Sequence, residues 1–421
     1  MRRLLLAIIL LELPLQIDAN LFRDELDASH GAISGINVSL TTICLIALYA
    51  MSLPGMVVRA PRGATPSLRA AIPLFVYLCV LVASVVVATD TKLAFFEIVL
   101  LFQTFLLFVY LVFWTRTKED VLFVVGVLLL GVVIQGTLMM GVKAVGHDIG
   151  VSVVSARVDE EGRIEGTLGS PNDAAAYLTL FLVPSLAVLT MPLPRRYKLM
   201  AAAALVLGVL ALLLTLSRGG LLAFGISCGV FCLLACQRGR MSWRLPVAMA
   251  TIALVAVLLN QEALAARFTD DDGSASARLP LAELAAMMIS DHPLIGVGAN
   301  NCSVVSGDYV NTVELRTAWL YVIHNKYLLV WVESGILGLA AYLWFLVAVL
   351  RRGWVAWQLD DRILAPLGLA FAAAMFGQMF HMLVDVFHSR VQVQNFWLVA
   401  ALIVAIYNVS RDEADDVGQL T

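Results

Sequence analysis

Charged residues are scarce in this sequence. Lys, Arg, Asp and Glu make up 14% of its 421 residues, whereas soluble domains carry about 25%. Hydrophobic residues make up 61%, and the mean hydropathy is +0.89. A soluble protein is therefore excluded. The apolar runs are near twenty residues long, not the roughly ten-residue alternating segments of a transmembrane barrel, so the fold class is all-α and polytopic.

The sequence also lacks the motifs that mark many cofactor-dependent enzymes. It has no glycine-rich nucleotide loop, no metal-ligand motif and no Ser-His-Asp signature. The acidic run 270–272 offers oxygen ligands for a divalent cation, but a solvated loop explains it better, because hard-cation sites need ligands fixed by more than a run of aspartates. We expect no metal, no cofactor and no nucleic-acid partner. The cysteines form no disulfide framework, because only Cys302 lies outside the apolar runs.

The apolar runs predict twelve membrane-spanning helices. We expect the first to be retained rather than cleaved as a signal peptide, because Glu12 interrupts it and no small-x-small cleavage site follows. The predicted spans are 1–15, 36–58, 70–89, 93–114, 121–141, 173–191, 198–216, 219–236, 243–262, 325–348, 364–387 and 395–409.

Lys and Arg concentrate in every second connection between these spans, which identifies the cytoplasmic side. Together with Arg411, these short connections hold 17 of the 28 Lys and Arg residues. Both termini are therefore expected in the cytoplasm, and the intervening connections in the periplasm of a bacterial inner membrane. The predicted parts are 1–262, with spans one to nine and the periplasmic loop 142–172; 263–324, a helical periplasmic lid; and 325–421, with spans ten to twelve and an acidic tail.

Arginines stand out on the predicted outer side. Arg218 lies in a tight connection between two spans, followed by two glycines. It is either a snorkelling arginine at the headgroup level or an anion clamp, since guanidinium matches phosphate oxygens bidentately. Arg157 and Arg163 precede the turn 166–173, where Ser170 or Asn172 either caps the next helix or helps to form an anion site at its N-terminus.

Arg278 opens the run 279–289, which is apolar on nearly every face and is expected to lie against the membrane or the spans. His292 then begins a turn-rich return. His324 lies at the outer end of the tenth span, and its ordinary pKa near 6.5 suits it to accept a proton from a hydroxyl group. Asp385 falls in the eleventh span with His381 and His388 at helical spacing. A carboxylate at that depth needs a partner, for which His324 or an outer arginine is the candidate.

The chain resembles the O-antigen ligase and polymerase superfamily of bacterial inner membranes. The resemblance lies in Ser217-Arg218-Gly219, in Gly169-Ser170-Pro171-Asn172, and in the segment that runs from Arg278 through 292–298 to His324-Asn325 and Glu333-Ser334-Gly335. It covers roughly residues 160–345. The resemblance rests on the order of these motifs on one side of the membrane more than on any single motif.

The resemblance implies an O-antigen ligase. Such an enzyme moves O-antigen polysaccharide from undecaprenyl diphosphate to the lipid A-core oligosaccharide, without a metal and with inversion at the anomeric carbon. It implies that Arg218 and Arg278 hold the diphosphate and that His324 acts on the acceptor hydroxyl with Asp385 nearby. From their position on the outer side, we expect Arg157 and Arg163 to bind the diphosphate as well. A polymerase of the same superfamily and a flippase of lipid-linked glycan are the alternatives. The loops show no convincing paired arginine repeat, which favours ligase over polymerase.

Overall fold

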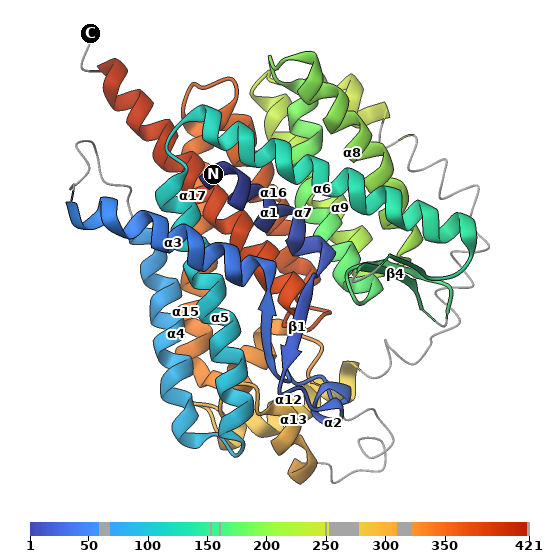
Figure 1. Ribbon diagram of the computed structural model, residues 1–421, viewed down its shortest axis with the longest axis vertical. Helices are drawn as coiled ribbons and strands as arrows, with labels where there is room; N and C mark the ends of the chain where they lie inside the picture. Colours follow the sequence, from blue (N-terminus) through green and yellow to red (C-terminus); the bar gives the residue numbers. More distant parts are fainter. Residues whose placement is uncertain are drawn as a thin grey trace.

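The protein is mostly helical in a computed structural model that describes residues 1–58, 68–151, 154–159, 161–248, 251, 278–309 and 322–418 (Figure 1). Most of the predicted ninth span, 243–262, and all of the acidic run 270–272 lie outside these residues. The helices are α1 (Arg2–Leu15), α2 (Glu25–Ser29), α3 (Leu40–Val58), α4 (Ala71–Ser84), α5 (Thr91–Trp114), α6 (Lys118–Val145), α7 (Pro171–Thr190), α8 (Arg195–Leu214), α9 (Arg218–Gln237), α12 (Arg278–Asp291), α13 (Cys302–Val305), α15 (Lys326–Gln358), α16 (Leu364–His381) and α17 (Arg390–Gly418).

Eight helices in the described residues are long and apolar enough to cross a membrane. They are α5, α6, α7, α8, α9, α15, α16 and α17. Two shorter apolar helical stretches, Leu40–Ser52 and Ala71–Val87, fall where further spans are predicted. The polytopic helical class is therefore confirmed, and the number of twelve spans stays a prediction.

The connections gather at two ends of the molecule, as the alternating arginines predict. At one end, Arg3 pairs with Asp120 at 3.0 Å, and Lys118 pairs with both Asp361 at 2.8 Å and Glu413 at 3.1 Å. The start of the chain and the end of α17 thus lie together, and the cytoplasmic location of both termini stays a prediction. We call this the charged end; it comprises residues 1–3, 115–120, 238–240, 358–363 and 411–414.

The connections predicted to lie outside meet at the other end, which we call the site end. The amide of Ile33 donates to Asn300 Oδ1 at 2.9 Å, and the amide of Asp90 donates to Asn301 Oδ1 at 2.7 Å. Figure 1 shows α2, α12 and α13 together at one extreme of the long axis. The described parts of the site end are residues 16–39, 88–91, 146–151, 154–159, 161–170, 215–218, 278–309, 322–325 and 382–390.

Short strands at the site end correct the purely helical prediction. The predicted second span, 36–58, begins with a strand instead, because the alternation Ile36-Asn37-Val38-Ser39 suits a two-residue period. Two antiparallel sheets result, with the strand orders β1-β2 and β3-β4-β5. The strands are β1 (Asp18–Leu21), β2 (Ile36–Ser39), β3 (Ile149–Val151), β4 (Val154–Val158) and β5 (Ile164–Gly166).

A break in α15 anchors the return from α12. Gly335 has φ +66°, and a Cβ there would lie 2.1 Å from the carbonyl oxygen of Leu294, so only glycine fits. At the break, the carbonyls of Val332 and Glu333 accept hydrogen bonds from amides of the segment 292–298, at 2.8 and 3.0 Å. This pairing fixes the end of α12 against the helix that follows His324.

Candidate functional site

Two of the turns singled out in the sequence are hydrogen-bonded to each other. Ser217 Oγ donates to Asn172 Oδ1 at 2.8 Å and accepts from the amide of Gly220, so it also caps α9. Ser170 caps α7 by accepting from the amide of Asp173 at 3.0 Å, which confirms one of the two capping candidates. The first turns of α7 and α9 are therefore held side by side.

Gly219 brings Arg218 next to a buried histidine. A Cβ at Gly219 would lie 2.6 Å from Cδ2 of His381, so a larger residue would push α9 away from α16. His381 Nδ1 lies 3.2 Å from Gln378 Oε1, and His381 Nε2 lies 3.7 Å from Asp385 Oδ2. The half-buried Arg218 thus begins its helix beside the His381–Asp385 pair.

The placement of Asp385 corrects the predicted helix. We expected Asp385 and His388 on one face of a span over 364–387, but α16 ends at His381 and the connection 382–389 is not helical. The reason is tertiary: the carbonyl of Met382 accepts a hydrogen bond from the amide of Lys326 at 2.9 Å. This contact turns the chain toward the start of α15.

The partners of the Asp385 carboxylate come from the connection 382–389 and from α17. Asp385 Oδ2 accepts from Gln392 Nε2 at 3.0 Å, and Oδ1 accepts from the amide of Val386 at 2.8 Å. Ser389 Oγ donates to Asp173 Oδ1 at 3.0 Å. The sequence reasoning missed these polar partners. Asp173 lies within the quoted turn 166–173, but nothing in the sequence connects it to this loop.

His324 lies directly before α15, where the side chain of Asn325 caps the helix. Its Nδ1 lies 3.0 Å from the carbonyl oxygen of Val322. A carbonyl oxygen can only accept, so Nδ1 carries the proton and Nε2 is the nitrogen with the lone pair. Burial lowers the pKa of His324, with the Arg278 guanidinium adding to the effect and Asp385 opposing it. The imidazole is therefore neutral at pH 7 and suited to accept a proton.

Arg278 is fixed by the apolar face of the helix that it begins. Leu281 and Leu284 of α12 are buried in one cluster with Ile323 and Leu329, as expected for a run that packs on the spans. The cluster flanks His324 on both sides in sequence. Its burial therefore ties the position of Arg278 to that of His324.

Arg163 and Arg157, the other two arginines predicted to bind the diphosphate, differ in burial. Arg163 is partly buried, and its Nε donates to the carbonyl of Thr215 at 3.2 Å, close to Arg218 in the chain. Asp159 lies 3.8 Å from the same Nε. Arg157 is exposed on β4. The structure therefore brings Arg163 to the start of α9 and leaves Arg157 on the surface.

Comparison with known families adds an independent observation. Residues 203–343 match the model of the family described as O-antigen ligase. Over this segment the chain is similar to O-antigen ligases. The family segment contains Arg218, Arg278 and His324, whereas Asp385, Arg163 and Arg157 lie outside it. A search of curated proteins gives no match.

The candidate site combines three chemical properties: cationic side chains, a neutral imidazole and a buried carboxylate. Guanidinium groups bind phosphate oxygens. A neutral imidazole beside a carboxylate can take up a proton, and the carboxylate then stabilises the imidazolium. In the part of the chain that the structure describes, no group of three His, Cys, Asp or Glu side chains is arranged to hold a metal. The absence of a metal requirement stays a prediction.

Proposed function

We propose that this membrane protein is a lipid-linked glycosyltransferase that ligates O-antigen. It transfers polysaccharide from undecaprenyl diphosphate to the lipid A-core oligosaccharide at the periplasmic face of a bacterial inner membrane. One observation carries the proposal: Nε2 of His324 is the lone-pair nitrogen of a neutral ring, and the charges of Asp385 and Arg278 both act on that ring. The match to the ligase family over 203–343 supports the reaction class.

The reaction breaks one bond and forms another at the anomeric carbon. His324 Nε2 takes the proton of an acceptor hydroxyl while that oxygen attacks the anomeric carbon from the face opposite the leaving group, so the configuration inverts. The bond to the diphosphate oxygen breaks, and undecaprenyl diphosphate leaves with the bonding electrons. Arg218 and Arg278 stabilise the charge that grows on the diphosphate, and Asp385 stabilises the imidazolium. No step needs a metal or a cofactor.

Arg163 and Arg157 are proposed to guide the diphosphate toward Arg218. Arg163 donates to the carbonyl of Thr215, three residues before Arg218, whereas Arg157 is exposed. We therefore assign Arg163 the larger share of this task.

Cells that lack the protein distinguish a ligase from its alternatives. Extracted lipids are separated, and the glycan that remains on undecaprenyl diphosphate is sized. Polymeric glycan is the expected result. Single repeat units would identify a polymerase instead. Glycan trapped on the cytoplasmic leaflet would identify a flippase.

A further inference from the structure

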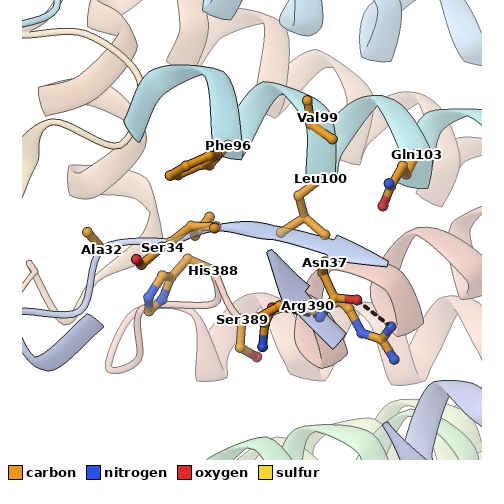
Figure 2. Close-up of a pocket in the computed structure, with 13 residues that line it drawn as sticks. Ala32, Ser34, Asn37, Phe96, Val99, Leu100, Gln103, His388, Ser389 and Arg390 are labelled. Carbon is orange, nitrogen blue, oxygen red and sulfur yellow. Dashed lines mark hydrogen bonds between the residues drawn. The ribbon is translucent and has the colours of Figure 1, made fainter. Parts of the chain in front are cut away.

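A cavity of about 170 Å³ lies between α5, the β1-β2 hairpin and the connection that carries Asp385. Figure 2 shows α5 side chains on one side and polar residues of the hairpin and of the connection on the other. A pyranose ring combines C–H faces with a rim of hydroxyl groups, so a cavity with both kinds of wall suits it. The lining residues used below are Ser34, Asn37, Phe96, Gln103, His388 and Arg390.

Two polar atoms of this lining are buried with no hydrogen-bond partner among the described residues: His388 Nδ1 and Arg390 Nε. Arg390 is only 9% exposed. Burial, with a smaller contribution from the charge of Lys326, lowers the pKa of His388 to about 3, so its ring is neutral at pH 7. Unpartnered buried polar atoms are unfavourable, and both atoms belong to residues that line the cavity.

The charge around Arg390 argues against an anionic occupant. Its guanidinium lies 2.6 Å from Glu12 Oε1 and 3.4 Å from Asp18 Oδ2, so two carboxylates already face one positive charge. A phosphate would have to displace one of them. The volume is also below the roughly 300–1,000 Å³ of pockets for drug-sized ligands. The occupant is therefore small, uncharged and polar.

We infer that this cavity is a subsite for one uncharged sugar ring of a glycan substrate. The inference rests on the proposed function, because it assigns the ring to a substrate of that reaction. The connection 382–389 supplies both His388 to the cavity and Asp385 to the site, and Ser389 of the same connection donates to Asp173. The ring belongs either to the lipid A-core acceptor or to the O-antigen donor.

Two substitutions alter the cavity without touching the residues assigned to catalysis or diphosphate binding. Gln103→Leu removes polar atoms from its wall, and Ser34→Leu fills part of its volume. Gln237→Leu at the end of α9, where the side chain is exposed, is the matched control. In the reconstituted enzyme, each cavity variant should raise the KM for one substrate about tenfold, with kcat nearly unchanged. A raised acceptor KM assigns the ring to the core, and a raised donor KM assigns it to O-antigen. An unchanged KM for both substrates overturns the inference.

A binding measurement separates this inference from the proposed function. Core oligosaccharide and O-antigen polysaccharide, each released from its lipid, are added separately to the purified protein during thermal unfolding. One of them should raise the unfolding temperature of the wild type and of Gln237→Leu but not of Gln103→Leu. If wild type shows this shift yet forms no covalent product, the proposed function fails and the subsite stands. If product forms while neither glycan shifts unfolding and neither KM changes, only the subsite fails.

Discussion

The two ends of the molecule use arginine in opposite ways. At the charged end, the side chains of the Arg3–Asp120 pair are 59% and 14% exposed, with a separation of 3.0 Å. At the site end, those of the Arg390–Glu12 pair are 7% and 1% exposed, with a separation of 2.6 Å. Exposed pairs contribute little to stability, whereas a buried charge must keep its partner. Arginine therefore forms an exposed ion pair at one end and a buried one at the other.

Replacing His324 should cause the largest loss. His324→Ala removes the proton acceptor, and general-base catalysis contributes about 10²- to 10⁴-fold, so the rate of glycan transfer should fall by that factor while donor binding persists. His292→Ala, an exposed turn residue at the same end, is the control and should retain transfer. Near-normal transfer by His324→Ala would show that His324 is not the general base.

The pH dependence of glycan transfer tests whether His324 acts as the base. The pKa of His324 in the folded protein is lowered by burial, so the ring stays neutral down to a pH below its ordinary value near 6.5. Transfer by wild type should stay flat through about pH 6.5 and should fall only as the pH drops through the lowered pKa of His324. The free energy of unfolding should also fall as the pH drops below about 6.5, because His324 binds a proton more readily in the unfolded chain than in the folded protein. A rate that stays flat while the ring of His324 becomes protonated would mean that His324 only orients the acceptor.

Loss of a diphosphate-binding arginine should be nearly as severe. Arg218→Ala and Arg278→Ala each remove charge stabilisation that grows in the transition state, a loss of about 10²- to 10³-fold in kcat. Arg351→Ala, at an exposed position of α15 toward the charged end, should transfer glycan at the normal rate. Equal losses of kcat in all three variants would contradict the proposed difference between the two ends.

The two arginine pairs can be compared through stability alone. Arg390→Met leaves Glu12 buried without its guanidinium and should lower the free energy of unfolding by about 3–5 kcal/mol. Arg3→Met should lower it by at most about 1 kcal/mol. Thermal unfolding in one detergent measures both, and adding Glu12→Gln to Arg390→Met should recover part of the loss. Similar losses from the two single variants would contradict the comparison.

The break in α15 predicts a smaller effect. Gly335→Ala forces a side chain into the contact with Leu294 and into positive φ, which should cost about 1–3 kcal/mol. The return 292–298 should loosen from α15, and its amides should exchange hydrogen faster. Gly307→Ala, where a Cβ meets no atom of the described residues within 4 Å, is the control.

Arg157→Ala should have the smallest effect. Its side chain is exposed on β4, so the KM for the donor should change by less than about tenfold, and Arg163→Ala should change it more. A larger effect of Arg157 than of Arg163 would place the diphosphate path over the β3-β4-β5 sheet.

The sequence predicted what depends on local pattern. Hydrophobic run length identified the helices, the alternating arginines identified the two ends, and α15 begins at Lys326, one residue from the predicted start of the tenth span at 325. The predicted end of the eleventh span was wrong. The helix stops at His381 because of the contact between Lys326 and Met382, which joins segments far apart in the chain. Gln392 as a partner of Asp385 was missed because the predicted span continued through Asp385, whereas the two residues meet across the non-helical connection 382–389.

Reconstitution of the purified protein in proteoliposomes tests the central claim most directly. Undecaprenyl-diphosphate-linked polysaccharide and lipid A-core are supplied in the same bilayer, and glycolipid products are separated and identified by mass. Wild type should form a covalent polysaccharide–lipid A-core product and release undecaprenyl diphosphate, and Arg278→Ala should not. Movement of the donor lipid between leaflets with no covalent product would contradict the account.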